Sequence, residues 1–245
     1  MNNPLYLFCG GAAIYGKGHP KPLMKIREDR SLLVHYLIYL KHQRLKMPER
    51  VTLLCDDDQE GAIDAELSNL TYSVPIHILA CGQRPNTFEK LCRALHGNED
   101  SNRVVQFGYP DIFSFDEFAA PQPEALISDA SVHISAAALT SRFPRLIVDV
   151  YNNKIRGISN YTSPVPANPL YVFGGDLWGR VDQILSLVKE FQDQAATAHP
   201  SLEYDFFFWL INHNKMQCLL LHGEQLRVDS IRDVNLLLER TGHFS

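Results

Sequence analysis

The chain has 245 residues, a net charge of −5 and a pI near 6.0, so it can form one substantial core and lacks the basic charge typical of a nucleic-acid binder. Its five cysteines are scattered without a C-x-x-C pair, which argues against a disulfide framework or a zinc site. The amino terminus has no signal-peptide pattern, and no segment reaches the ~20 apolar residues that span a bilayer. We therefore expect a cytoplasmic protein with neither membrane nor nucleic-acid partners.

Short apolar segments, most of them closed by Gly, Pro or Asp, predict strands at 5–9, 51–55, 76–80, 104–108, 131–139, 146–152, 170–175 and 216–222. Apolar residues spaced three to four apart predict helices at 31–45, 60–67, 87–95 and 177–192. Strand and helix alternate through the first hundred residues, which predicts a parallel α/β sheet. The later strands cluster, which predicts antiparallel additions. No repeat or long linker divides the chain, so we expect a single domain.

The segment GGAAIYGKGHPKPLMKI, residues 10–26, has the features of a phosphate-binding loop. Gly10 and Gly11 follow the first strand and allow the backbone to approach a ligand without a Cβ in the way. Lys21 lies between two prolines that fix φ, which partly preorganises its cation. In purely structural terms, the glycines form an ordinary strand-end turn and Lys21 is a solvated loop lysine.

The order of these pieces resembles that of the sugar-phosphate nucleotidyltransferases, which join a nucleoside triphosphate to a sugar 1-phosphate and release pyrophosphate. Their G-G-x-G-T-R and P-K-P-L patterns correspond to GGAAIY and PKPL in this chain. Their later segments are similar to RVVQFGYPDIFSF, LYVFGGDLW, LEYDFFFWLINHNK and LRVDSIRDVNLLLER. The resemblance covers nearly the whole chain. It implies one Rossmann-like, GT-A-like α/β domain with a mixed, mainly parallel sheet, a nucleotide-binding half at 1–118 and an acceptor-binding half at 119–245.

The resemblance also implies roles for individual residues. Lys21 would be catalytic, and Asp111 and Asp229 would be catalytic ligands of Mg²⁺, which commonly binds one or two carboxylates plus substrate phosphates. Both aspartates follow or end predicted strands, where open α/β sheets collect ligands. The implied nucleotide-binding residues are Gly10, Gly11, Ala13, Lys17, Gln83 and Thr87, and the implied substrate-binding residues are Asn160 and Glu203.

Several of these residues also have a structural interpretation. Ser230 and Asp233 form an S-x-x-D capping box that opens a helix, and this box leaves Asp229 unexplained. In the structural interpretation, Asp111 is a turn residue and Asp229 flanks a helix. Thr87 is then the N-cap of a helix, and Glu203 is a capping or surface residue.

Departures from the family pattern leave several functions open. Tyr15 stands in place of the arginine of G-x-G-T-R, where Lys17 is a candidate substitute, and Ala13 replaces a glycine. Asn160 and Tyr161 replace a Glu-Lys pair that grips the sugar phosphate. The chain is then either an enzyme for an unusual phosphorylated acceptor, met by Lys154, Arg156 or Arg84, or a noncatalytic relative that binds a nucleotide or a partner. A third hypothesis is a glycosyltransferase, with Asp56 and Asp58 as a D-x-D metal motif. The base, the acceptor and assembly into a homo-oligomer are left open.

Overall fold

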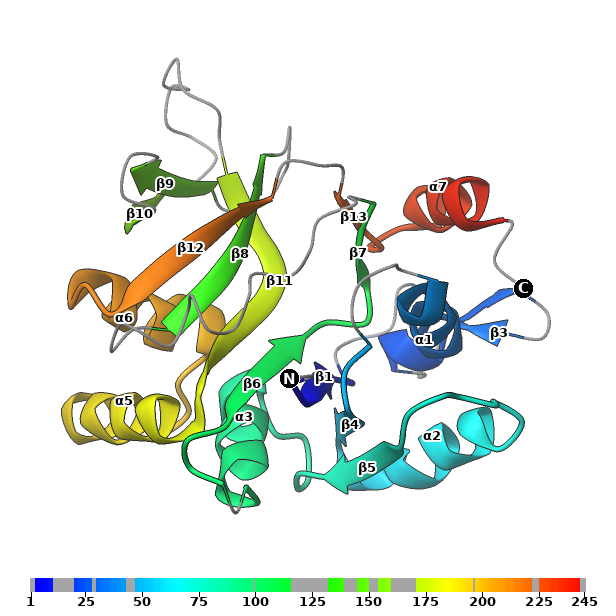
Figure 1. The fold of residues 1–245 in the computed structure, drawn as a ribbon, viewed down its shortest axis with the longest axis horizontal. Coiled ribbons are helices and arrows are strands. Elements are labelled where there is room, and N and C mark those ends of the chain that lie inside the picture. Colours follow the sequence, from blue (N-terminus) through cyan, green and yellow to red (C-terminus); the bar gives the residue numbers. More distant parts are fainter. Residues whose placement is uncertain are drawn as a thin grey trace.

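The computed structural model describes residues 3–10, 20–27, 30–42, 47–98, 100–115, 132–138, 145–149, 154–159, 171–195, 197–221 and 225–242. In these residues a nine-stranded sheet runs in the order β5-β4-β1-β6-β11-β8-β12-β10-β9 (Figure 1). Its strands are β1 (Leu5–Phe8), β4 (Val51–Cys55), β5 (Ile76–Ala80), β6 (Val104–Gly108), β8 (Val132–Ala138), β9 (Arg145–Asp149), β10 (Lys154–Ser159), β11 (Tyr171–Arg180) and β12 (Met216–Leu221).

The two halves of the sheet differ in strand direction. β1 pairs in parallel with both β4 and β6, and β4 pairs in parallel with β5. The second half joins through β11, which is antiparallel to β6 and β8, whereas β12 runs parallel to β8. This arrangement confirms the predicted α/β fold, with a parallel sheet built by the early strand-helix alternation and antiparallel additions after it.

Helices cover both faces of the sheet. On one face lie α1 (Leu32–His42), α2 (Glu60–Leu67) and α7 (Ile231–Thr241), which share a buried apolar cluster with β1 and β4. On the other lie α3 (Thr87–His96), α5 (Val181–Gln194) and α6 (Phe207–Asn212), whose cluster includes residues of β6, β8 and β11. Figure 1 shows the two groups on opposite sides. The carboxyl ends of the parallel strands are left for ligands.

One predicted helix boundary was wrong, and five strands were not predicted. The helix expected from residue 177 begins at Val181, because Leu177 and Trp178 pair with Phe107 and Gln106 as the end of β11. Apolar residues in this strand imitate helical spacing. The unpredicted strands are β10, which pairs with β9, and four short strands. The short strands form two small sheets: β2 (Lys25–Arg27) with β3 (Arg30–Ser31), and β7 (Ile112–Ser114) with β13 (Gln225–Arg227).

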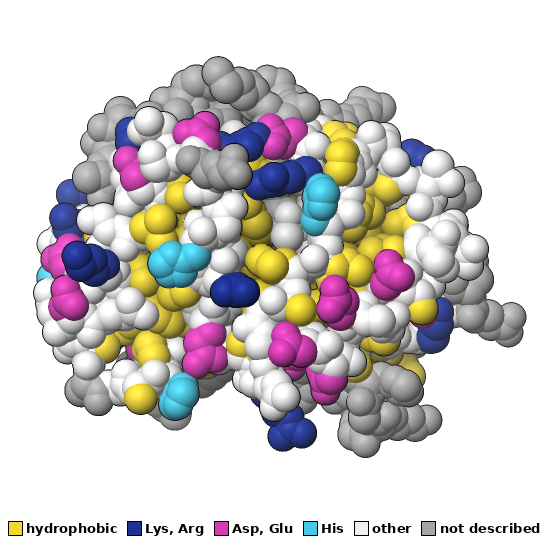
Figure 2. Space-filling view, turned by 90° about the horizontal axis from the view of Figure 1, so that it is seen from below, with side chains coloured by type: hydrophobic (Ala, Val, Ile, Leu, Met, Phe, Trp, Pro, Cys, Tyr) yellow, Lys and Arg dark blue, Asp and Glu magenta, His cyan; other side chains and the backbone are white. Residues whose placement is uncertain are grey.

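Two further observations concern the charge pattern of the surface and the length of the helices. On the face seen in Figure 2, acidic and basic side chains are interspersed among apolar ones. Within the part of the chain that the structure describes, no helix is both long enough and apolar enough to cross a membrane.

Candidate active site

The β7–β13 pair brings together two aspartates that are far apart in the sequence. Asp111 lies in the turn between β6 and β7, and Asp229 follows β13. Arg227 pairs with Ile112 in register, and one step further the Val228 amide donates to the Asp111 carbonyl at 2.8 Å. This antiparallel pairing places the two carboxylates beside each other.

Lys21 joins the two aspartates. It begins a short 3₁₀ helix, Lys21–Leu23, where Pro20 is the N-cap residue and Pro22 is buried. Its Nζ donates to Asp229 Oδ1 at 2.6 Å and forms a short hydrogen-bonded ion pair with Asp111 Oδ2. The Lys21 side chain is only 12% exposed, so the interpretation of Lys21 as a solvated loop lysine is wrong.

Arg227 completes the cluster and was not found from the sequence. Its Nε lies 3.4 Å from Asp229 Oδ2 and 3.8 Å from Asp111 Oδ2. Arg227 and Asp229 are two residues apart in an extended segment, so their side chains leave the same face of the strand. This spacing is the one sequence signal that could have identified Arg227. Two cations and two anions therefore balance in formal charge, and we call Lys21, Asp111, Arg227 and Asp229 the charged cluster.

The two carboxylates fit a magnesium ion. Mg²⁺ is commonly held by one or two carboxylates, with substrate phosphates and water as its other ligands. The Lys21 ammonium already lies between both carboxylates, which shows that this space accepts a cation. Among the described residues no group of three or more His, Cys, Asp or Glu side chains is placed to hold a metal. Substrate phosphates are common further ligands of Mg²⁺ at a site of this kind.

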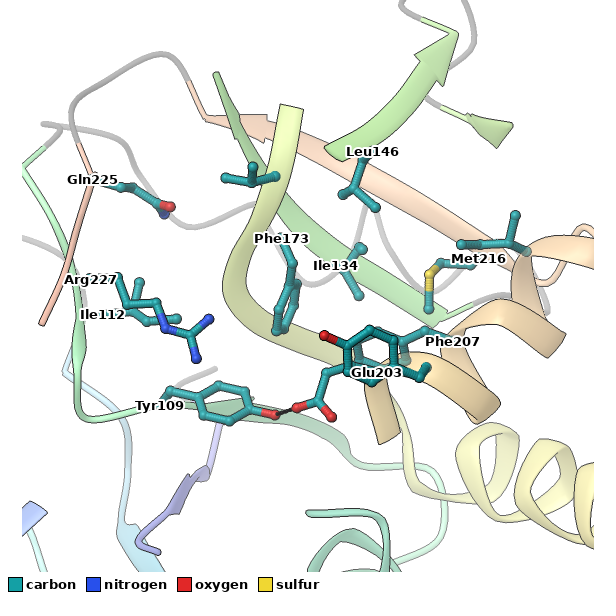
Figure 3. Close-up of a pocket in the computed structure, with 13 residues that line it drawn as sticks. Tyr109, Ile112, Ile134, Leu146, Phe173, Glu203, Phe207, Met216, Gln225 and Arg227 are labelled. Carbon is teal, nitrogen blue, oxygen red and sulfur yellow. Dashed lines mark hydrogen bonds between the residues drawn. The ribbon is translucent and has the colours of Figure 1, made fainter. Parts of the chain in front are cut away.

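A cavity of about 420 Å³ adjoins the charged cluster and shares Arg227 with it. Its wall comes from the second half of the sheet, from the segment around β7 and β13, and from the helical segment 202–211 (Figure 3). The lining residues are Tyr109, Ile112, Ile134, Leu146, Val172, Phe173, Glu203, Tyr204, Phe207, Ile211, Met216, Gln225 and Arg227.

Glu203 faces this cavity from a π-helical segment, Leu202–Phe206, that precedes α6. Its carboxylate accepts a short hydrogen bond from the Tyr109 hydroxyl (Figure 3). Burial, reinforced by the Glu203 charge, raises the pKa of Tyr109 well above its ordinary value, so the phenol remains a donor. The cap of the segment is Ser201, whose Oγ accepts from the Tyr204 amide. The interpretation of Glu203 as a cap is therefore wrong, whereas its role toward a substrate stays a prediction.

Gly10 lies at the carboxyl end of β1 above a buried lysine. Lys90 of α3 pairs with Asp56 at 2.7 Å and donates to the Cys9 carbonyl at 3.1 Å. A Cβ on residue 10 would collide with Lys90 Nζ, so a larger residue here would have to displace the lysine from its partners. Whether the backbone also meets a ligand stays a prediction.

In the D-x-D segment, Asp56 and the intervening Asp57 have structural contacts, whereas Asp58 is exposed. Asp56 is the partner of Lys90, and Asp57 Oδ1 accepts from the Gly82 amide at 2.8 Å. The Asp57 bond ties the turns after β4 and β5 together, and the Asp56 ion pair ties the first of these turns to α3. They give the segment a structural role, which weakens the glycosyltransferase hypothesis.

Gln83 lies in the turn after β5 and Thr87 at the first position of α3, and the nucleotide contacts predicted for them stay predictions. Gln83 is exposed. The N-cap of α3 is Asn86, which forms a capping box with Glu89, so the interpretation of Thr87 as an N-cap is wrong. The remaining predicted binding residues, Gly11, Ala13, Lys17 and Asn160, lie outside the described residues.

Compared by sequence, the chain matches no protein-family model and no curated protein. Several solved structures match it over nearly its whole length. HddC from Yersinia pseudotuberculosis, also solved with GMP-PN, has a TM-score of 0.72 and 15% identity, with 97% of this chain and 99% of that chain covered.

Two further structures have similar scores. The inositol-1-phosphate CTP transferase from T. maritima has a TM-score of 0.69 and 13% identity, with 100% and 98% of the two chains covered. The UTP-bound UGPase from Acinetobacter baumannii has a TM-score of 0.68 and 14% identity, with 99% and 94% covered. The chain therefore shares the fold of these solved structures over nearly its whole length.

Proposed function

We propose that this protein is a Mg²⁺-dependent nucleotidyltransferase that joins a nucleoside triphosphate to a sugar 1-phosphate or a similar phosphorylated acceptor. The products are an activated nucleotide conjugate and pyrophosphate. Residues 1–118 form the nucleotide side and residues 119–245 the acceptor side, and we place the enzyme in the cytoplasm. The nucleotides named in the HddC and UGPase structures, GMP-PN and UTP, support a nucleotide ligand for the shared fold.

The observation that carries this proposal is the charged cluster beside the cavity. Lys21 Nζ bonds both Asp111 and Asp229, and Arg227 belongs to the cluster and to the cavity wall. An acceptor bound in the cavity can therefore present its phosphate to the cluster. The structural interpretation of each aspartate alone does not explain why they share one lysine.

The reaction requires two polyanions to approach each other. A phosphate oxygen of the acceptor attacks the α-phosphorus of the triphosphate, a new P–O bond forms, and the bond to the bridging oxygen breaks as pyrophosphate leaves. Catalysis of this kind depends mainly on positioning and on electrostatic stabilisation. Lys21 and Arg227 supply positive charge at the cluster, where the acceptor phosphate and the triphosphate would meet.

Asp111 and Asp229 would hold the magnesium ion, which, when bound, polarises phosphoryl oxygens and offsets the charge of the triphosphate. The Lys21 ammonium now occupies the space between these carboxylates. A metal ion held in this space would displace the Lys21 ammonium, which would then be able to contact a phosphate. The same lysine would neutralise the negative charge of the two carboxylates before the substrates bind, and it would bind phosphate afterwards.

A pyrophosphate-release assay tests the proposal. Each of the four ribonucleoside triphosphates and deoxythymidine triphosphate would be paired with a panel of sugar 1-phosphates and other phosphomonoesters, with Mg²⁺ present. We expect release with at least one pair, and a loss of about 10²-fold or more in Asp111→Asn and Asp229→Asn because the metal ligands are removed.

Asp64→Asn is the matched control, since Asp64 is exposed on α2 and away from the cluster. Its release rate should equal that of the wild type. Nucleotide binding without release by any pair would reject the enzyme and support a noncatalytic binding protein. Equal rates in all three variants would place the reaction elsewhere.

A further inference from the structure

The cavity wall has an unusual composition for a polyhydroxylated ligand. Eight of its described lining residues are aliphatic, methionine or phenylalanine, and two are tyrosines. The polar groups are already engaged in part, because Gln225 Nε2 donates to the Gly174 carbonyl at 3.0 Å and the Tyr109 hydroxyl donates to Glu203. Sugar hydroxyls buried against such a wall would lose hydrogen bonds to water without equivalent replacements.

Aromatic rings line one continuous part of this wall. The Tyr109 and Phe173 centroids are 6.0 Å apart, and those of Phe173 and Phe207 are 5.4 Å apart, both in edge-to-face arrangements. Tyr204 adds a further ring to the lining. Faces of aromatic rings attract organic cations, and sets of such rings recognise quaternary ammonium groups.

Glu203 places a negative charge among these rings. Among the described residues its carboxylate accepts one side-chain hydrogen bond, from Tyr109, and no basic side chain is within ion-pair distance of it. A carboxylate in apolar surroundings favours a cationic partner, because burying an unpaired charge is costly. In Figure 3, Tyr109 extends from beside Arg227 to Glu203, so the two charges lie at different parts of the cavity.

The charges therefore match a zwitterion. Arg227 and Lys21 lie at the end where an acceptor phosphate would react, and Arg227 is balanced there by Asp111 and Asp229. Glu203 and the ring of Phe207 lie at the other part of the wall, and Tyr109 reaches from one part to the other. A ligand with a phosphate and a cationic group would satisfy both.

We propose, on the basis of the nucleotidyltransferase function above, that the acceptor is a phosphomonoester that carries a compact organic cation, such as an aminoalkyl or alkylammonium phosphate. Its cationic group binds Glu203 and the rings of Tyr109, Phe173 and Phe207. Nucleotidyl transfer to this acceptor proceeds as written for the general reaction. The new bond joins its phosphate oxygen to the α-phosphorus, and the ammonium group takes no part in bond making.

Calorimetric titration with Mg²⁺ present tests this proposal without requiring turnover. The probes are phosphocholine, 3,3-dimethylbutyl phosphate, which replaces the ammonium nitrogen with carbon at nearly the same shape, and glucose 1-phosphate. We expect phosphocholine to bind at least tenfold more tightly than either comparison compound. Glu203→Gln should remove most of this preference and leave the affinity for the neutral isostere unchanged.

The matched control is Glu190→Gln, an exposed position on α5, which should bind all three probes as the wild type does. Thermal unfolding of each variant verifies that the fold is intact. Equal affinity for phosphocholine and its neutral isostere would overturn the cation site and leave an apolar pocket. Binding of glucose 1-phosphate alone would overturn the acceptor class.

The outcome separates this proposal from the one on which it rests. Pyrophosphate release with a sugar 1-phosphate and none with phosphocholine would retain the nucleotidyltransferase and reject the cationic acceptor. Tight phosphocholine binding that depends on Glu203, without pyrophosphate release from any triphosphate, would retain the cation site and reject the enzyme.

Discussion

Lys21→Met should destabilise the protein when no divalent metal is present, because it leaves two carboxylates facing each other. Asp111 and Asp229 have side chains that are 11% and 26% exposed, and both now bond the Lys21 ammonium. Removing one partner of a fully buried ion pair costs about 3–5 kcal/mol. Partial exposure and Arg227, which stays within 3.4 Å of Asp229, reduce this cost, so we expect a loss of about 1–3 kcal/mol.

Magnesium should reverse this loss, because it can occupy the space that the ammonium leaves. A ligand present at 100 times its dissociation constant stabilises the native state by about 2.7 kcal/mol. Mg²⁺ should therefore stabilise Lys21→Met more than the wild type, in which it must displace the lysine. Pyrophosphate release, in contrast, should fall by about 10²-fold or more even with saturating Mg²⁺, since the phosphate-binding cation is gone.

The assay is urea denaturation with chelator and with increasing Mg²⁺. Lys25→Met is the matched control, because Lys25 is 50% exposed and pairs with Glu66 at 2.6 Å away from the cluster. It should lose at most about 1 kcal/mol, with no change in the effect of Mg²⁺. If Lys21→Met is as stable as this control, or if Mg²⁺ stabilises it no more than the wild type, the reasoning fails.

Three further predictions concern stability. Burial raises the pKa of Asp176 from about 3.8 to about 6, so the fold favours the protonated acid, and its ionisation costs stability as pH rises from about 4 through 6. Asp176→Asn should therefore be about 1–3 kcal/mol more stable than the wild type at pH 8 and little different at pH 4. A stability difference that does not change with pH in denaturation experiments would contradict this. Asn86→Ala should lose about 1 kcal/mol on urea denaturation, because the Glu89 amide loses the Asn86 side-chain oxygen that caps α3, and an unchanged midpoint would refute the cap. Gly10→Ala should lower the free energy of unfolding by about 1–3 kcal/mol, because the added Cβ displaces the Lys90 ammonium from Asp56 and the Cys9 carbonyl. Wild-type stability in the same assay would show that the lysine relocates freely.

The sequence predicted the parts of the fold that depend on local patterns. Apolar runs closed by turn residues identified β1, β4, β5 and β6, and the three-to-four spacing identified α2 and α3 within a residue. The S-x-x-D pattern correctly placed Ser230 as the cap of α7. The end of β11 was missed because a strand buried on both faces loses the alternation that marks strands, and its apolar residues then imitate a helix.

The site could be predicted only in part, because its parts meet through tertiary pairing. Family resemblance singled out Lys21, Asp111 and Asp229, which the structure brings together, although their roles stay proposals. The strands that align the two aspartates are three residues long, too short for a periodic signal. Tyr109 and Arg227 were missed for the same reason, since their importance depends on partners remote in the sequence.

Phosphorus NMR of a single reaction mixture tests the central claim most directly, because it identifies the bonds made and broken. The mixture would contain the enzyme, Mg²⁺, the triphosphate and the acceptor selected by the release assay. We predict equal growth of inorganic pyrophosphate and of a diphosphate diester that links the nucleoside to the acceptor, with both absent in Asp111→Asn. Release of orthophosphate without a diester, or an unchanged spectrum with every triphosphate, would contradict nucleotidyl transfer at the charged cluster.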